Sequence, residues 1–155
     1  MSPRNILVPV DGSENAVKAV EYADNLANDT GARLTLIHVM EDAGSYRLSD
    51  ELRELAKIEH VNITERDVRQ SRADRTLAEA AAKVVTCKGD RLHQHIGEGN
   101  PTDEIVAYAR DNGIDLIVIA SRGLSDFRGL LLGSVSHKVV QLAECPCLVV
   151  RQTAA

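Results

Sequence analysis

Short apolar segments alternate with helical patterns along the whole chain, and this alternation strongly limits the folds open to it. Residues 6–10, 34–39, 116–120 and 147–150 are almost continuously apolar, which is typical of parallel strands that helices cover on both faces. Residues 92–96 alternate apolar and polar side chains and therefore predict a more exposed edge strand. With right-handed crossovers, these segments predict a three-layer, doubly wound α/β fold whose five-stranded parallel sheet has the order 3-2-1-4-5.

Helical signals fill the spaces between these strands. Alanine and valine recur at helical spacing over residues 16–27, and Gly31 follows in the position that usually ends a helix. Asn100 is a predicted N-cap, with Pro101 at the first helical position. A last helix is expected at about residues 134–143.

Residues 40–74 are harder to interpret. Leucines begin a helical pattern there, but residues 61–72 are polar and aperiodic, and a regular helix returns only from Ala73. We predict one or two helices with a loose joint. A segment this polar beside a ligand site could act as a mobile cover.

Composition excludes several classes of function. The chain of 155 residues, without repeat or linker, is expected to form a single domain over residues 1–155. Its 18 Lys and Arg residues against 23 Asp and Glu residues give a net charge of −5, which argues against binding to nucleic acid. No apolar segment is long enough to cross a membrane, no secretion signal is evident, and three cysteines suggest reduced thiols. We therefore expect a cytoplasmic protein with no membrane or nucleic-acid partner.

The sheet order brings the ends of the first and fourth strands together, and Rossmann-like sheets bind ligands at this switch point. Two segments follow these strands, residues 9–13 and 120–136. The second contains Gly123 and, at the start of the last helix, Gly133-Ser134, where unpaired N–H groups favour an anion. This segment is not a Walker A phosphate-binding loop, because the pattern Gly-x4-Gly-Lys-Ser/Thr with its lysine is missing. The turn after the first strand also lacks the Gly-x-Gly-x-x-Gly fingerprint of dinucleotide-binding proteins. The chemistry alone leaves a phosphate site and an ordinary glycine-rich surface loop equally open.

Three sequence blocks resemble the universal stress protein family. They are Val-Pro-Val-Asp-Gly-Ser at residues 8–13, the pattern Gly-x2-Gly-x9-Gly-Ser/Thr across residues 120–134, and Cys-Pro-Cys-Leu-Val-Val-Arg at residues 145–151. The resemblance covers essentially the whole chain. One departure is Ala120, which stands where the ATP-binding branch usually has its first glycine.

The resemblance implies an ATP-binding homodimer and assigns roles to several residues. Asp11 would hydrogen-bond the ribose or the adenine edge, and Val39 and Met40 would flank the base. The phosphates, accompanied by Mg²⁺, would be wrapped by the loop after the fourth strand. The implied nucleotide-binding residues are Pro9, Val10, Asp11, Val39, Met40, Ala120, Arg122, Gly123, Gly133, Ser134, Val135 and Ser136.

Each of these residues also has a purely structural interpretation. Asp11 can form a turn or cap the first helix, and Ser136 can cap the last one. Val39 and Met40 fit a core, whereas Arg122 and Arg128 fit a solvated surface.

The histidines do not indicate a metal site. His93 and His95 share a strand face but fall short of the three protein ligands of a catalytic zinc. We expect His38 to be a satisfied core side chain and His137 to lie on a solvated helix face. No metal ligand or catalytic residue is assigned.

The predicted function is that of a stress-response ATP-binding protein with slow or no ATP hydrolysis. Fast phosphoryl transfer needs metal ligands and a cationic clamp, and the first site loop offers only Asp11, with no lysine beside the glycines. One alternative is a nucleotide-free interaction protein that acts through an unknown protein partner, which Ala120 favours. Another is a sensor of AMP or a cyclic nucleotide.

The last strand suggests how two copies pair. It lies at a sheet edge, yet Leu148, Val149 and Val150 are apolar, and such edges are usually blunted by charge or proline. We predict a homodimer through this strand.

Overall fold

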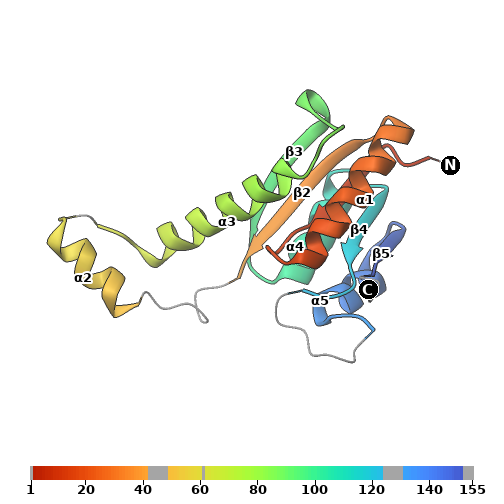
Figure 1. Cartoon of the computed structure of the whole chain (residues 1–155). Coiled ribbons are helices and arrows are strands. Elements are labelled where there is room, and N and C mark those ends of the chain that lie inside the picture. The colour runs from red at the N-terminus through yellow and green to blue at the C-terminus, as the bar shows by residue number, and fades with distance from the viewer. Residues whose placement is uncertain (1, 42–48, 61, 124–130, 152–155) are drawn as a thin grey trace.

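In the computed structural model, residues 2–41, 49–60, 62–123 and 131–151 are described. The elements in chain order are β1 (Asn5–Pro9), α1 (Glu14–Thr30), β2 (Arg33–Met40), α2 (Asp50–Ile58), α3 (Glu65–Ala82), the 3₁₀ turn η2 (Gly89–Arg91), β3 (Leu92–Glu98), α4 (Pro101–Asp111), β4 (Leu116–Ala120), α5 (Ser134–Leu142) and β5 (Cys147–Val150). Figure 1 shows the sheet with its helices. All neighbouring strands pair in parallel, in the order β3-β2-β1-β4-β5. The predicted fold class and strand order are confirmed.

Two apolar cores hold the three layers together. On one face of the sheet, Leu34 and Leu36 of β2 pack with Val20 of α1 and Leu77 of α3. On the other face, neighbouring strand residues pack with α4 and α5, through side chains such as Ile105 and Val139. The alternation of side chains along β2 therefore decides which helix layer each residue meets.

The predicted helix ends are largely confirmed. Ser13 caps α1 by accepting a hydrogen bond from the N–H of Ala16 at 3.1 Å, and Gly31 ends the helix with a left-handed φ of 76°. Asn100 caps α4, with Pro101 at its first position. Pro9, which cannot donate to the sheet, is the last residue of β1, as expected.

The segment after β2 forms two helices, and the prediction for its second helix was wrong about the start. The helix begins at Glu65 rather than at Ala73, because Thr64 and Asp67 form a capping box in which each side chain accepts from the other's backbone N–H. This box starts a helix without apolar periodicity. The first helix, α2, stands away from the sheet (Figure 1) and buries none of its residues.

A buried carboxylate joins α1 to the chain between α3 and β3. Asp24 is 3% exposed and accepts hydrogen bonds from the N–H of Val85 at 2.7 Å, from the N–H and hydroxyl of Thr86 at 3.0 and 2.7 Å, and from the N–H of Cys87 at 2.8 Å. Burial raises the pKa of this carboxyl, but these hydrogen bonds outweigh it and hold the pKa below its ordinary value. The carboxylate therefore stays charged while it is buried.

None of the helices in the described part of the chain has the length and apolar content that a membrane crossing requires.

Candidate functional site

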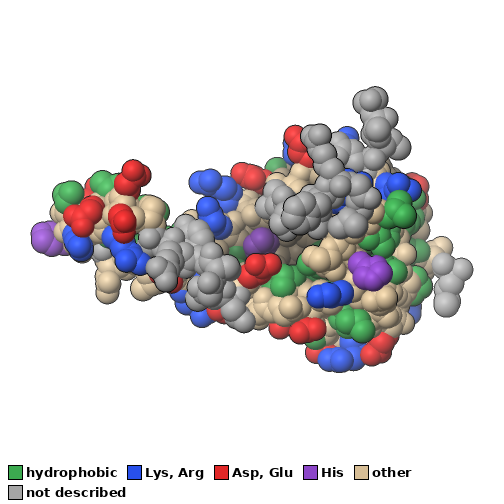
Figure 2. Space-filling view, turned by 90° about the horizontal axis from the view of Figure 1, so that it is seen from below, with side chains coloured by type: hydrophobic (Ala, Val, Ile, Leu, Met, Phe, Trp, Pro, Cys, Tyr) green, Lys and Arg blue, Asp and Glu red, His purple; other side chains and the backbone are tan. Residues whose placement is uncertain are grey.

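A cavity of about 690 Å³ opens at the carboxyl ends of β1, β2 and β4, the position that the strand order predicted. Its walls come from these strands, from the turn after β1 and from α3, α4 and α5. Seen from below, this face of the molecule is hollowed, and positively charged side chains gather beside the hollow (Figure 2). The volume falls in the ordinary range of small-molecule sites.

Nearly all of the nucleotide-binding residues predicted from the sequence line the cavity. Of the twelve, eleven line it: Pro9, Val10, Asp11, Val39, Met40, Ala120, Arg122, Gly123, Ser134, Val135 and Ser136. Gly133 is the N-cap of α5 directly behind the wall. Arg128 lies outside the described residues.

One side of the cavity is apolar. Ile37, Val39, Ile105, Ile119 and Val135 line it from the sheet face that α4 and α5 cover. We call this set the apolar lobe. It offers a surface suited to a flat, uncharged ring.

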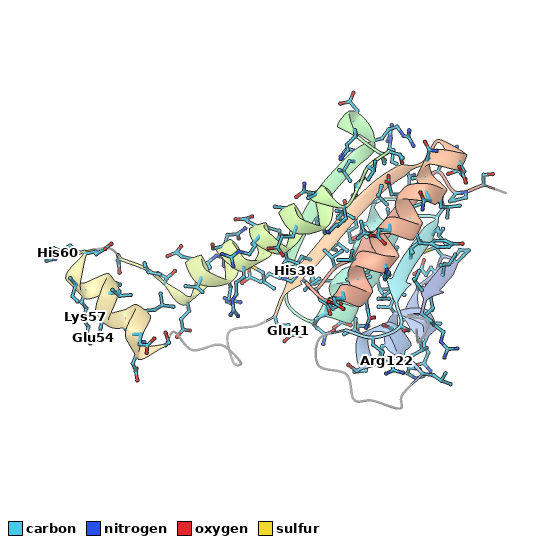
Figure 3. The ribbon with its side chains drawn as sticks, viewed as in Figure 1. His38, Glu41, Glu54, Lys57, His60 and Arg122 are labelled. Carbon is cyan, nitrogen blue, oxygen red and sulfur yellow. The ribbon has the colours of Figure 1, made fainter. Side chains whose placement is uncertain are left out.

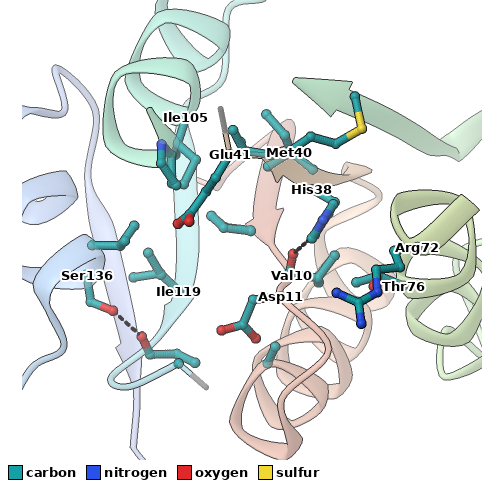
Figure 4. A pocket seen from close by; sticks show the side chains of 18 of the residues that line it. Val10, Asp11, His38, Met40, Glu41, Arg72, Thr76, Ile105, Ile119 and Ser136 are labelled. Atoms are coloured by element: carbon teal, nitrogen blue, oxygen red, sulfur yellow. Dashed lines mark hydrogen bonds between the residues drawn. The ribbon is translucent and has the colours of Figure 1, made fainter. Parts of the chain in front are cut away.

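Asp11 lies beside the apolar lobe in the turn after β1 (Figure 4). Its Oδ1 accepts a hydrogen bond from the N–H of Ser13 at 2.9 Å, so it shapes the turn. The cap of α1 is Ser13, which leaves Asp11 as a turn-former that also lines the cavity. Asp11 therefore forms a turn and does not cap the helix, and its place in the cavity wall is compatible with a hydrogen bond to a ligand.

The first turn of α5 differs from those of the other α-helices in the described chain. Side chains of Ser13, Ser49, Thr64 and Asn100 cap α1 to α4, whereas Gly133 provides no side-chain cap to α5. The N–H groups of the first turn have no partner within the helix. They belong to Ser134, Val135 and Ser136, which line the cavity.

Two hydrogen-bond donors that were expected to contact a ligand already donate to carbonyl groups of the protein. The N–H of Gly133 donates to the carbonyl of Ser121 at 2.6 Å. The hydroxyl of the buried Ser136 donates to the carbonyl of Ala120 at 2.6 Å (Figure 4), so it ties α5 to β4 and does not cap its helix, contrary to the structural interpretation of this residue. What Ser136 can offer a ligand is its backbone N–H.

A third wall was missed in the sequence. Arg69, Arg72, Arg75 and Thr76 of α3 line the cavity, at spacings that place them along one side of the helix. They went unrecognised because the helix was expected to start at Ala73. The capping pattern of Thr64 and Asp67 was the available signal.

His38 corrects another expectation. Its Nδ1 hydrogen-bonds the carbonyl of Val10 at 2.8 Å, so the side chain is satisfied, but it is half-buried and lines the cavity rather than the core. Figure 3 shows His38 and Glu41 near the end of β2, with Arg122 after β4. Glu54 and Lys57 of α2, and His60 just after this helix, lie at the other end of the molecule (Figure 3). His137 is exposed and does not line the cavity.

The cavity wall is cationic although the chain is acidic. Four arginines line it, Arg69, Arg72, Arg75 and Arg122, against two described carboxylates, Asp11 and Glu41, while the whole chain carries −5. Arg69 also donates to the carbonyl of Glu41 at 2.7 Å and so fixes the end of β2. This charge distribution favours an anionic ligand.

The described residues provide neither a protein metal cage nor an activated thiol. No group of three His, Cys, Asp or Glu side chains among them could hold a metal ion. Burial raises the pKa of Cys87, of Cys145 and of Cys147, which disfavours the nucleophilic thiolate.

A doubly wound α/β protein with a cation-lined ligand cavity at its switch point is the class that this fold and site define. The universal stress protein family model matches residues 3–151, and the chain belongs to this family.

Relatives agree over nearly the full length. The chain is 35% identical over 158 residues to universal stress protein YxiE of Bacillus subtilis, covering 94% of this chain and 97% of that protein. Among solved structures, universal stress protein UspA from Lactobacillus plantarum matches with a TM-score of 0.74 at 30% identity, covering 96% and 97% of the two chains.

Two further structures share the fold at 24% identity. One is a universal stress protein in complex with cAMP, with a TM-score of 0.69 and coverage of 99% and 100%. The other is the universal stress protein from Archaeoglobus fulgidus in complex with dAMP, with a TM-score of 0.65 and coverage of 96% and 98%.

Proposed function

We propose that this protein binds an adenine nucleotide, ATP with Mg²⁺, in the cavity and acts as a nucleotide-binding stress-response protein. The observation that carries the proposal is the first turn of α5. Its N–H groups at Ser134, Val135 and Ser136 lack a side-chain cap and line a cationic cavity. A helix N-terminus with free N–H groups binds phosphate without needing a lysine.

Different parts of the cavity wall suit the adenine, the ribose and the phosphates of a nucleotide. The apolar lobe takes the adenine, with Val39 and Met40 beside it, and Asp11 accepts hydrogen bonds from the ribose or the adenine edge. The phosphates lie along Arg122, Gly123 and the start of α5. Mg²⁺ bound to nucleotide phosphates usually keeps several waters and takes few protein ligands. This fits a cavity whose described residues include no group of three metal-ligating side chains.

Ala120 is compatible with this ligand. It belongs to the core that α1 and α3 cover, and it is 7% exposed, so its methyl group takes little of the cavity. Its carbonyl holds the hydroxyl of Ser136, a contact made by the backbone alone. The departure from the family's glycine therefore gives little support to the nucleotide-free alternative.

Hydrolysis of the bound nucleotide is slow or absent in this proposal. Efficient phosphoryl transfer needs a positioned nucleophile, a base and several metal contacts. Asp11 and Glu41 are the carboxylates that the described wall offers, and the described residues provide no group of three ligands that could hold a metal ion. A single-turnover rate near about 1–10³ per second, typical of enzymes, would contradict this part of the proposal.

A monophosphate sensor is the second candidate. The structures that hold cAMP and dAMP favour it, because both ligands carry one phosphate. The comparison of ATP with AMP and cAMP separates the two candidates.

We also propose that two copies pair through β5. Leu148, Val149 and Val150 are half-buried in the single chain and lie on an edge strand. Apolar edges without charge or proline are suited to pairing with another strand.

The deciding experiment changes one N–H group of α5. Ser134→Pro removes the N–H at the first helical position, where proline is tolerated, and Gly133 before it already has the extended backbone that proline requires, with φ −69° and ψ 168°. Ser134→Ala is the matched control, because it removes the hydroxyl and keeps the N–H. Calorimetric titration measures ATP with Mg²⁺, AMP and cAMP on nucleotide-free protein.

We expect Ser134→Ala to bind ATP like the unchanged protein and Ser134→Pro to bind roughly tenfold more weakly, the equivalent of about 1.4 kcal/mol. Stronger binding of AMP or cAMP than of ATP would favour the sensor. If no nucleotide binds and none is released when the purified protein is denatured, the nucleotide-free interaction protein is the better description.

A further inference from the structure

The cavity extends beyond the part that the proposed nucleotide uses. Along β2, Leu36 and His38 share one face and Ile37 and Val39 share the other. Leu36 lies in the core under α1 and α3, whereas Ile37 lies in the core under α4 and α5. Since His38 and Ile37 both line the cavity, the cavity passes over the end of the sheet onto both faces.

The part on the α1 and α3 side has its own lining. We call it the α3 lobe, and it is formed by His38, Arg72, Arg75 and Thr76. In Figure 4, His38, Arg72 and Thr76 lie on one side of Asp11, and Ser136 and Ile119 lie on the other. The α3 lobe is therefore separate from the start of α5, where the proposed function places the nucleotide phosphates.

The neighbouring arginines on α3 have a different role from those of the lobe. Arg66 and Arg69 pair with Glu98 at 3.2 and 3.7 Å and dock α3 onto the end of β3. Within the described chain, Arg75 makes no hydrogen bond or ion pair to another residue, and it lines the cavity beside Arg72. Glu98 is thus already shared by two arginines that precede the lobe, and Arg75 keeps its positive charge beside the cavity.

Polar groups complement these charges. The hydroxyl of Thr76 lies near the turn after β1, 3.8 Å from the position that a Cβ on Gly12 would occupy. His38 donates its Nδ1 hydrogen to the carbonyl of Val10, because a carbonyl can only accept. This bond fixes the imidazole at the floor of the lobe. Guanidinium forks beside a hydroxyl are a donor set suited to phosphate oxygens.

Asp11 determines what can lie between the two ends. Its carboxylate repels an anion placed directly on it and accepts hydrogen bonds from hydroxyl groups. A ligand that spans the cavity therefore needs anionic groups at both ends and neutral donors in the middle. A nucleotide with one phosphate on the 5′ side and another on the ribose has this arrangement.

We propose that the α3 lobe, through Arg72, Arg75 and Thr76, is a second anion subsite that takes a phosphate distinct from those at α5. The ligand class is a nucleoside bisphosphate with a phosphate on the 2′ or 3′ oxygen, and the same chemistry would hold a free phosphate beside a bound nucleotide. The nucleoside part of this inference rests on the proposed function, whereas the anion subsite is testable without it.

The test compares three nucleotides by calorimetry: 5′-AMP, adenosine 3′,5′-bisphosphate and adenosine 2′,5′-bisphosphate. Each is titrated into the unchanged protein, Arg75→Gln and Arg33→Gln. Arg33 is exposed at the opposite end of β2 and outside the cavity, so Arg33→Gln is a control with the same change of charge. A fourth titration adds inorganic phosphate to each protein, with and without AMP.

We expect one of the bisphosphates to bind roughly tenfold more tightly than AMP, a gain that one charge-assisted contact can supply. Arg75→Gln should abolish this gain and leave the affinity for AMP unchanged, and Arg33→Gln should keep both. If the bisphosphates bind like AMP but inorganic phosphate binds and depends on Arg75, the subsite holds a free anion.

The outcomes separate the two proposals. If AMP binds, but neither bisphosphate gains affinity and phosphate does not bind, the second subsite is wrong while the proposed function stands. If no nucleotide binds and phosphate binding depends on Arg75, the proposed function fails and the subsite stands. If Arg33→Gln removes the tighter binding of the bisphosphate as fully as Arg75→Gln does, the subsite is also wrong, because the effect would then be a long-range effect of charge.

Discussion

The carboxylate of Asp24 allows the sharpest prediction about stability. In Asp24→Asn the side chain keeps its shape, and its remaining oxygen can still accept from the N–H of Cys87 and the hydroxyl of Thr86. The new amide NH₂ would then face the N–H groups of Val85 and Thr86, which lie 2.7 and 3.0 Å from Oδ2. The two short hydrogen bonds to Oδ2 are replaced by contacts between donors, and the N–H of Thr86 keeps only its longer hydrogen bond to Oδ1 at 3.3 Å.

The expected loss follows from those two contacts. Each partly buried N–H that loses its partner costs about 1–3 kcal/mol, and Val85 and Thr86 have exposed side chains, which favours the lower half of that range. We expect the free energy of unfolding to fall by about 3 kcal/mol. For a chain of 155 residues this lowers Tm by roughly 6–12 °C.

Urea unfolding and thermal melting of purified protein measure this loss. Asp29→Asn, an exposed position on the same helix, is the matched control and should change the unfolding free energy by less than about 0.5 kcal/mol. If Asp24→Asn is as stable as Asp29→Asn, the hydrogen bonds to Asp24 do not stabilise the fold and the reasoning is wrong.

The pH dependence has a definite sign. The pKa of Asp24 is lower in the folded protein than its ordinary value of 3.8, so the unfolded chain binds the proton more readily. The stabilisation is therefore fully present above pH 3.8 and is lost as the pH falls through the lower, folded value. The difference in stability between the unchanged protein and Asp24→Asn should stay constant near neutral pH and narrow in acid.

Two further predictions concern the β5 edge and the start of α4. Val149→Lys places a charge on the β5 edge and should convert the homodimer to monomers in light scattering, and a dimer that persists would place the interface elsewhere. Asn100→Ala removes the side-chain oxygen that accepts from the N–H of Asp103 at 3.2 Å and should lower the free energy of urea unfolding by about 1 kcal/mol. Asn100→Gly should lose only a few tenths of that amount, and equal losses in the two variants would show that the cap does not matter.

The fold was predictable because its main signals are local. The largely apolar segments of β1, β2 and β4 mark strands that are covered on both faces, and Gly31 and Asn100 mark the ends of helices. The switch point then located the ligand cavity. The start of α3 was missed because the capping box of Thr64 and Asp67 opens a helix whose first turns bury no apolar side chain.

The candidate site was only partly predictable because some of its features depend on the three-dimensional path of the chain. Arg72 and Arg75 reach the cavity only because α3 packs against β2, far from them in sequence. His38 has the strand alternation of a core residue, but it lies near the end of β2, where the cavity replaces a covering helix. The hydrogen bond from Gly133 to Ser121 follows from the return of the chain after β4, which no spacing in the sequence encodes.

The two edges of the sheet are unlike each other. β3 ends the sheet on one side with exposed His93 and Gln94, and β5 ends it on the other with apolar Leu148 and Val149. If copies join through β5 about a two-fold axis, each copy uses its apolar edge and presents a polar edge outward. Assembly then closes at two copies, and the sheet cannot extend into an open filament.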